Sequence, residues 1–222
     1  IFIPLSVSLI KKYDQFQKPP ERSEDESTKQ NPLTRKKLLK DKTFWMILPG
    51  SLFLPFFITG FFIHQNLIAA NSSWTMEWMA ICFIGFGISR ILAYIVSSYL
   101  VDKFSSRRVF IFQHIPIMLG TLILLLFDHK IALMIFMVLT GLTASTAVIN
   151  NTGIWAEIYG VEHLGMIKGL VSSFVIFSTS MAPVIMSYLF ASEFMMRVTF
   201  VGVCLSIVFL VILASYAVKK RN

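Results

Sequence analysis

The sequence predicts an all-α protein that crosses a membrane six times, and two observations support this prediction. First, 55% of the 222 residues are hydrophobic and only 14% are charged, with a mean hydropathy of +0.70. A soluble domain carries about a quarter charged residues, because its surface faces water. Second, the charges are concentrated between apolar segments, each near the roughly 20 residues that a helix needs to cross a bilayer. The predicted spans are 44–68, 78–101, 109–127, 131–152, 170–191 and 198–218.

The placement of Lys and Arg predicts how these spans are oriented. Segment 11–43 carries ten of these residues and loop 102–108 carries three, whereas the alternate loops carry only Lys130 and Arg197. Basic residues next to membrane spans accumulate on the cytoplasmic side. We therefore expect both ends of the six-helix block to be cytoplasmic, including the tail 219–222. This placement also explains the net charge of +8 without a nucleic-acid partner.

The N-terminal residues are predicted to form a linker. Residues 1–10 are apolar but too short to span, and we interpret them as the end of a preceding transmembrane helix. Residues 17–32 contain no aliphatic or aromatic side chain, so part of the cytoplasmic linker 11–43 should be disordered. The following residues, 33–43, suit either a basic amphipathic helix on an anionic leaflet or a solvated linker. The chain would then be the second part of a longer protein.

The stretch "SYLVDKFSSRR" at 98–108 places an acid and three bases in a tight turn between two predicted spans. The acid can accept hydrogen bonds from the bases or from a helix N-terminus, while the bases meet phosphate headgroups. Such contacts break easily when helices slide apart. The stretch resembles the signature loop of the major facilitator superfamily, and this resemblance implies a cytoplasmic latch, by which we mean contacts that hold one conformational state. The residues of this latch motif are Ser98, Asp102, Lys103, Arg107 and Arg108, and Glu157 of the next cytoplasmic loop is a candidate to join them.

The latch motif resembles the signature loop of the major facilitator superfamily, with Ser105 where that signature has glycine. Glycine permits a positive φ that serine adopts less readily. The stretches "TFWMILPGSLFLPFFITGFFIHQ" and "GIWAEIYGVEHLGMIKGLVSSFVIFSTSMAPVIMSYLF" also resemble bacterial members of this family. The resemblance implies that 44–218 form transmembrane helices 7–12 of a twelve-helix fold, with 11–43 as the linker between halves.

The resemblance further implies a function, partners and a location. It implies a secondary active transporter that moves a small solute by alternating access, as symport or antiport with H⁺ or another ion. The partners would be membrane lipids, the substrate and the N-terminal half of the same transporter. The location would be a bacterial inner membrane. No cofactor or metal is expected, and the substrate is unassigned.

Arg90 is the sharpest candidate for a working residue. It lies about halfway along 78–101, where an arginine costs about 2.5–3.5 kcal/mol to insert. No acid of the chain is predicted at that depth. Arg90 therefore meets an anionic substrate or an acid of the other half in one interpretation, and forms a structural pair or reaches the interface in the other. The first interpretation suggests an organic-anion carrier of the monocarboxylate or oxalate type.

Further polar residues are candidates for a substrate pathway. His64, Gln65 and Asn66 lie about 20 residues into the first predicted span, which two prolines and two glycines weaken. Broken helices are favoured where the backbone lines a cavity. Asn150 and Asn151 suit either a pathway or hydrogen bonds between helices. His114 is interpreted as an interfacial residue.

Two other classes of function compete with transport. A membrane enzyme would need paired acids, histidines or nucleophiles at one depth, and the sequence shows no such cluster. Nucleotide-driven pumping is disfavoured because there is no GxxxxGK[ST] loop. A transport-inactive membrane receptor or scaffold stays open as an alternative.

Overall fold

A computed structural model describes residues 33–72, 74–127 and 129–219. The expectations for residues 1–32 and for the end of the tail lie outside the described residues. Within the described part, the regular structure is helical throughout, and six helices are long and apolar enough to cross a membrane. The predicted fold class, an all-α polytopic protein, is confirmed.

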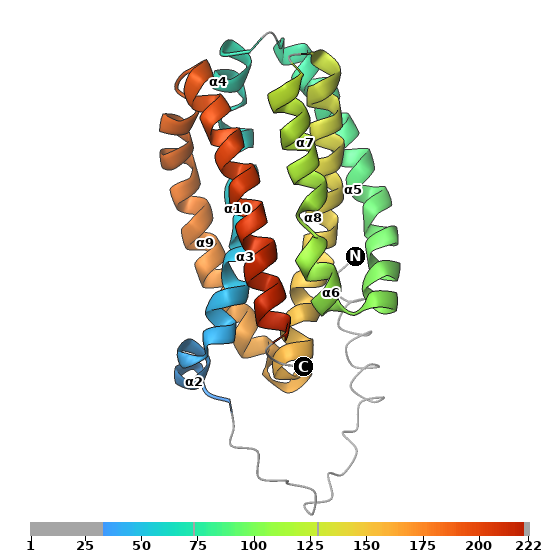
Figure 1. Cartoon of the computed structure of the whole chain (residues 1–222), viewed down its shortest axis with the longest axis vertical. Helices are drawn as coiled ribbons and strands as arrows, with labels where there is room; N and C mark the ends of the chain where they lie inside the picture. The colour runs from blue at the N-terminus through green and yellow to red at the C-terminus, as the bar shows by residue number, and fades with distance from the viewer. Residues whose placement is uncertain (1–32, 73, 128, 220–222) are drawn as a thin grey trace, which may run out of the picture. The chain divides into compact units, whose positions relative to one another are not determined.

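The helices run in chain order as labelled in Figure 1. They are α2 (Arg35–Lys40), α3 (Lys42–Ile63), α4 (Gln65–Ala70), α5 (Met76–Phe104), α6 (Ser106–Phe112), α7 (Ile115–Leu126), α8 (Lys130–Tyr159), α9 (Leu164–Leu189) and α10 (Glu193–Lys219), with a 3₁₀ turn η2 (Val161–His163) before α9.

Several helices begin beyond the predicted spans because polar side chains cap them. The side chains of Thr34, Asp41, Thr75 and His129 accept hydrogen bonds from the first backbone N–H groups of α2, α3, α5 and α8. Those groups have no partner inside a helix, so a capping acceptor fixes where the helix starts. The long helices therefore extend past the hydrocarbon-sized apolar runs.

The first predicted span is divided at His64. Helix α3 ends at Ile63, and α4 begins at Gln65. The His64 backbone N–H donates to the Gly60 carbonyl at 3.2 Å, and its Nδ1 donates to the same oxygen at 2.9 Å. These two bonds satisfy a carbonyl at the end of α3, and the chain turns there instead of continuing as the single helix 44–68.

The third span is broken too, between α6 and α7. Pro116 has no N–H to give to the carbonyl four residues earlier. The next amide, Ile117 N–H, donates across to Thr143 Oγ1 of α8 at 3.1 Å. Two successive helical hydrogen bonds are thereby lost. The predicted single helix 109–127 is therefore two helices that meet at Gln113 and His114.

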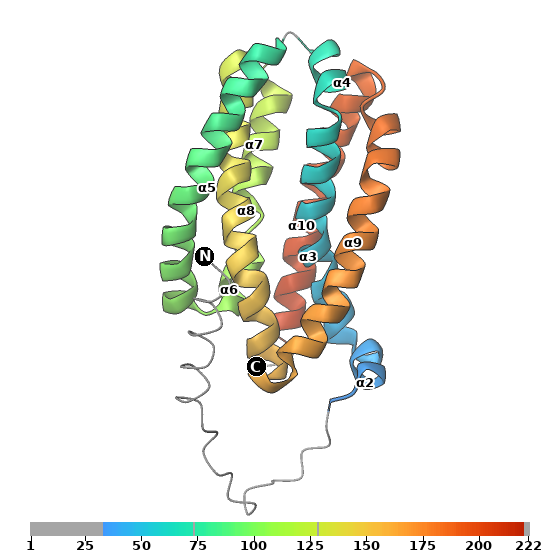
Figure 2. The same cartoon turned by 180° about the vertical axis from the view of Figure 1, so that it is seen from behind.

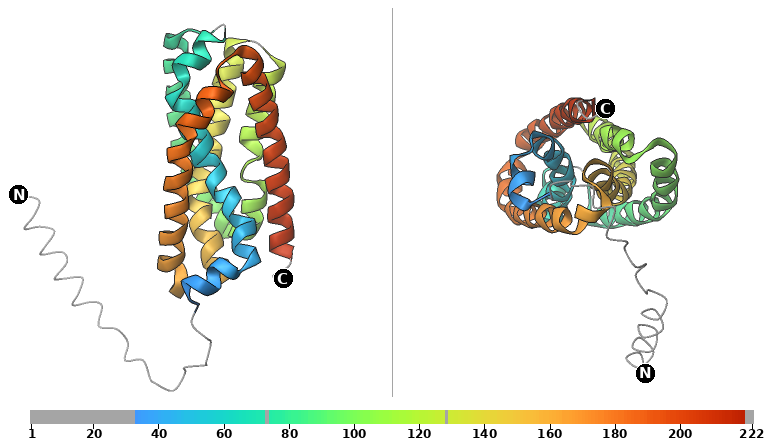
Figure 3. Two further views of the ribbon diagram at one scale, coloured as in Figure 1. Left: turned by 90° about the vertical axis from the view of Figure 1, so that its left-hand side faces the viewer. Right: turned by 90° about the horizontal axis from the view of Figure 1, so that it is seen from below.

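Helix α8 lies at the centre of the packing. It packs along α5, α6 and α7 and also touches α3 and α9 (Figure 3). Small residues allow α5 and α8 to approach each other closely. A Cβ added to Gly141 of α8 would lie 2.1 Å from Ser89 Oγ and 2.6 Å from the Phe86 carbonyl oxygen of α5. Aromatic side chains fill the space between α3 and α8, where the ring centroids of Phe61 and Phe136 are 5.1 Å apart.

The bundle has two different faces. Helices α5, α8, α3 and α9 lie side by side on the face that Figure 2 shows, while α7 and α10 lie toward the viewer in Figure 1. Helices α5 and α9 bury the smallest shares of their apolar segments. Their exposed apolar side chains include Ile84, Ile88, Ile91 and Ile95 on α5 and Ile176, Phe177, Val184 and Tyr188 on α9.

Helix α2, the α5–α6 loop and η2 lie at the same end of the bundle (Figure 1). We call this the basic end, because it carries Arg35, Lys36, Lys37, Lys40, Lys103, Arg107 and Arg108.

Candidate functional site

The α5–α6 loop turns sharply at Ser105, which has a φ of 72° and a ψ of 143°. This is the position where the signature loop has glycine. Among the described residues, Ser105 is the only one other than glycine with a positive φ. The turn ends α5, and Ser105 Oγ caps α6 by accepting from the Arg107 backbone N–H at 3.3 Å. The chain thus makes the tight turn with a serine that caps the next helix.

Glu157, near the end of α8, holds the start of α6. Its Oε1 accepts from the Ser106 backbone N–H at 2.6 Å. Its Oε2 accepts from Ser105 Oγ at 2.8 Å and from the Arg107 backbone N–H at 3.2 Å. Arg107 also donates from Nη2 to the Glu157 carbonyl oxygen at 2.9 Å. A carboxylate at a helix N-terminus is favoured electrostatically, so Glu157 ties the α5–α6 loop to α8.

The other latch-motif residues stay outside this cluster. Asp102 is exposed, and no hydrogen bond or ion pair joins its carboxylate to another residue that the structure describes. The Lys103 ammonium lies over the rings of Tyr99 and Phe104, 5.6 and 5.5 Å from their centroids. Ser98 Oγ donates to the Tyr94 carbonyl of its own helix at 3.0 Å.

The loop borders a cavity of about 730 Å³ at the basic end. Its lining includes Asp102, Lys103, Arg107, Arg108 and Glu157. Both signs of charge therefore face one solvent-accessible space beside the loop.

Arg90 lies fourteen residues from either end of α5 and is half-buried. Its guanidinium carbon is 5.9 Å from the centroid of the Phe86 ring. Its backbone carbonyl accepts from Ser145 Oγ of α8 at 2.7 Å. Within the described ranges, no carboxylate pairs with the guanidinium. The middle of α5 therefore presents a cation without an acid from this chain's described part.

The remaining candidate residues lie apart from Arg90. His64, Gln65 and Asn66 lie at the α3–α4 break, near the end of the bundle opposite the basic end (Figure 1). Asn150 Nδ2 donates to Gln113 Oε1 at 3.1 Å, and Asn151 Oδ1 accepts from Ser51 Oγ at 3.4 Å. Asn150 thus joins α8 to the break between α6 and α7, and Asn151 joins α8 to α3.

With this geometry established, comparison with known proteins gives the family. Residues 51–222 match the Major Facilitator Superfamily. The chain belongs to this superfamily. Its members are transporters, so the chain is a multi-pass membrane transporter component and not an enzyme. None of the curated proteins or solved structures compared with the chain matches it.

In this superfamily chain, the break between α6 and α7 contains polar residues that sequence reasoning underrated. His114, interpreted from the sequence as an interfacial residue, is only 2% exposed, so its side chain is buried among the helices. Its ring packs edge-on against Phe53 of α3, with the centroids 5.6 Å apart. His114 therefore lies at the helix break with its side chain buried among the helices. The pair Gln113–His114 directly before "IP", inside an apolar run, is the signal that identifies such a break.

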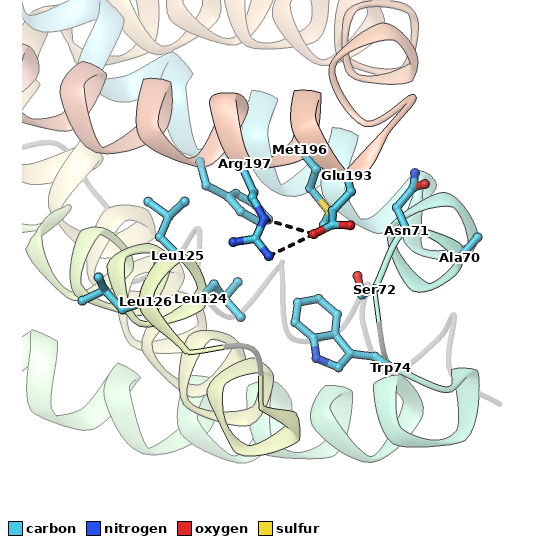
Figure 4. A pocket seen from close by; sticks show the side chains of 11 residues that line it. Ala70, Asn71, Ser72, Trp74, Leu124, Leu125, Leu126, Glu193, Met196 and Arg197 are labelled. Carbon is cyan, nitrogen blue, oxygen red and sulfur yellow. Dashed lines mark hydrogen bonds and ion pairs between the residues drawn. The ribbon is translucent and has the colours of Figure 1, made fainter.

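A second site was not predicted at all. A pocket of about 400 Å³ lies at the end opposite the basic end, lined by Trp74 and by the ion pair Glu193–Arg197 (Figure 4). The Arg197 Nη2 is 2.9 Å from Glu193 Oε1, and both side chains are more than half exposed. An exposed pair one helical turn apart contributes little energy, so this pocket is a weaker candidate than the loop and Arg90.

Proposed function

We propose that the chain forms the second six-helix half of a secondary active transporter, which moves a small solute by alternating access. The observation that carries the proposal is the pair of apolar faces on α5 and α9. Helices α5 and α9 lie on the side of the bundle that Figure 2 shows, together with α3 and α8, and their exposed apolar side chains have no partner among the described residues. An N-terminal half packed there would enclose a site at the membrane midplane.

The proposal also assigns roles to residues at the basic end. In a bacterial inner membrane, this end would face the cytoplasm. The α5–α6 loop is the latch, with Glu157 holding its helix start and Asp102 available to a helix of the other half. The half-chain alone should not transport, because it supplies one wall of the site. The pathway candidates on α3, α4 and α8 would contribute polar groups at different depths.

Uptake into proteoliposomes tests the proposal. The full-length transporter that contains this chain is reconstituted and offered a panel of labelled neutral, cationic and anionic solutes, with and without an imposed pH gradient. Expected is saturable uptake of one solute class that depends on an ion gradient. Residues 1–222 alone are the matched control. Uptake by these residues at the full-length rate would contradict the two-half proposal, and absence of uptake for every class would favour a receptor or scaffold.

Arg90 favours a second, narrower candidate, an organic-anion carrier of the monocarboxylate or oxalate type. A half-buried guanidinium in the middle of a membrane helix needs a counter-charge, and the described residues supply none. Arginine binds a planar carboxylate through two parallel hydrogen bonds. In the solute panel, preference for carboxylates supports this candidate, and preference for a cation contradicts it.

A further inference from the structure

Helix α2 presents an unusually basic surface at the basic end. Between Thr34 and Lys42 the chain has five bases and a single acid, Asp41. Asp41 is already engaged, since Oδ1 accepts from the Thr43 backbone N–H and Oδ2 accepts from the Tyr159 hydroxyl, both at 2.9 Å. The bases Arg35, Lys36, Lys40 and Lys42 are exposed. Five bases against one acid leave this surface with an excess of positive charge.

Two apolar side chains lie beside these bases. Leu39 is 39% exposed and Trp45 is 47% exposed. The Trp45 indole N–H donates to the Leu39 carbonyl at 2.8 Å, which connects α2 to the first turn of α3. Leu38, the residue before Leu39 in α2, is fully buried. A short helix that is anchored by one leucine and exposes bases together with apolar groups fits a bilayer surface, where phosphates lie above an apolar layer.

The last turn of α8 connects α2 to the latch loop. Tyr159 holds Asp41, at the junction of α2 and α3, by the 2.9 Å hydrogen bond from its hydroxyl. Glu157, two residues earlier, holds Ser105 and Ser106 of the α5–α6 loop. One helical turn thus binds both elements. A force that fixes α2 therefore favours the position of α8 in which Glu157 meets the loop.

We propose that α2 docks on an anionic lipid leaflet, and that docking stabilises the α5–α6 loop through Asp41, Tyr159 and Glu157. Such coupling is reciprocal, because any stabilisation of the loop must equally strengthen docking. The inference goes beyond transport and rests on the proposed function only in placing the basic end at a membrane surface. Its test measures backbone protection, so its outcome is independent of whether a transported solute is found.

The test is hydrogen–deuterium exchange on the full-length protein. The protein is placed in nanodiscs of phosphatidylcholine alone, or with about a third of the lipid replaced by phosphatidylglycerol. Exchange is followed in residues 35–40 and 102–108. Expected is slower exchange in both segments in the anionic nanodiscs. Unchanged exchange at 35–40 would overturn the docking. A third sample, neutral nanodiscs with soluble glycerol phosphate, should show no protection, and protection there would indicate a free-anion site instead.

Two variants separate docking from coupling. The pair Lys36→Gln/Lys40→Gln should lose most of the lipid-dependent protection of both segments, because two surface bases together strengthen docking on the order of thirtyfold. The matched control Lys168→Gln/Lys219→Gln removes two exposed bases outside α2 and should behave as wild type. Equal losses in the two pairs would overturn a specific role for α2.

Tyr159→Phe removes only the hydroxyl that reaches Asp41. This variant should keep the lipid-dependent protection at 35–40 and lose it at 102–108. Retained protection of the loop would overturn the coupling, while leaving the docking itself intact.

Discussion

Glu157 Oε1 lies 2.6 Å from the backbone nitrogen of Ser106, so the end of α8 caps the start of α6 across 51 residues of sequence. The same carboxylate also binds the Ser105 hydroxyl and the Arg107 backbone N–H. This relationship makes Glu157 the residue around which the α5–α6 loop is organised.

Glu157→Gln should therefore destabilise the loop. The amide keeps the shape of the side chain but loses the negative charge, and one of its ends cannot accept hydrogen bonds from N–H groups. Bonds to a charged acceptor contribute about 1.5–3 kcal/mol each when buried, and partial exposure lowers the expected total cost to about 1–2 kcal/mol. Thermal unfolding in detergent measures it. Glu162→Gln is the control. Glu162 is exposed, and its Oε1 lies 3.8 Å from His163 Nε2, which is a weak contact. The cost of this substitution should therefore stay below about 0.5 kcal/mol. Equal costs would remove Glu157 from the centre of the loop.

Ser105 offers a test of backbone strain. Its positive φ costs a non-glycine residue about 1–3 kcal/mol. Ser105→Gly relieves this strain but loses the hydroxyl that binds Glu157, so its stability should stay near wild type. Ser105→Ala loses the same hydroxyl and keeps the strain. The glycine variant should therefore be more stable than the alanine variant by about 1–2 kcal/mol in thermal unfolding. The reverse order would show that the turn in solution does not have this conformation.

The sequence predicted much of the fold but not its breaks. Apolar runs of helical length were sufficient to find six spans, because the bilayer imposes that length. The break at Gln113 and His114 was missed, since a proline near a helix start is compatible with a continuous span. It depends on Thr143 of α8 taking the Ile117 N–H, a contact between residues 26 positions apart.

The candidate site shows the same limit. The departure of Ser105 from the glycine of the signature was visible in the sequence, as was Glu157 as a candidate near the loop. Which acid holds the loop was not, because both Asp102 and Glu157 were available by position. Packing of α6 against α8 decides it in favour of Glu157 within the described residues. Arg90 was found because a lone charge in an apolar run is conspicuous in any sequence.

The buried pair Gln113–Asn150 should show energetic coupling. Gln113 Nε2 and Asn150 Oδ1 have no hydrogen-bond partner among the described residues, while Asn150 Nδ2 donates to Gln113 Oε1 at 3.1 Å. Gln113→Met or Asn150→Leu alone leaves the partner amide unsatisfied and should cost about 1–3 kcal/mol. The double variant should cost less than the sum, with a coupling energy near the roughly 0.6–1.7 kcal/mol measured for hydrogen bonds between membrane helices. If the unfolding free-energy changes of the two single variants simply add in the double variant, the hydrogen bond between the two amides does not contribute to stability.

Asp102→Asn should affect transport without affecting stability. The Asp102 carboxylate is exposed and makes no hydrogen bond or ion pair with another described residue, so unfolding of the variant should match wild type within about 0.5 kcal/mol. As part of the proposed latch, its charge should hold the other half. Loss of that charge should slow turnover and shift the population toward the cytoplasm-open state. Wild-type transport together with unchanged cysteine accessibility at the cytoplasmic face would contradict the latch role.

Arg90 gives the sharpest test of the substrate. If its guanidinium binds an anionic solute, Arg90→Lys keeps the charge but loses the planar set of five donors, and Arg90→Gln loses both. Uptake should then fall in the order wild type, Lys, Gln, while the protein inserts and purifies normally. If Arg90 instead pairs with an acid of the other half, its removal leaves that acid unpaired in a low dielectric, so the folding yield falls first and neutralising the acid restores it. The two explanations differ in which quantity fails, and measuring yield and uptake on the same preparations separates them. Wild-type yield and wild-type uptake in Arg90→Gln would exclude both explanations. A charge that costs about 2.5–3.5 kcal/mol to insert would then contribute neither to folding nor to transport.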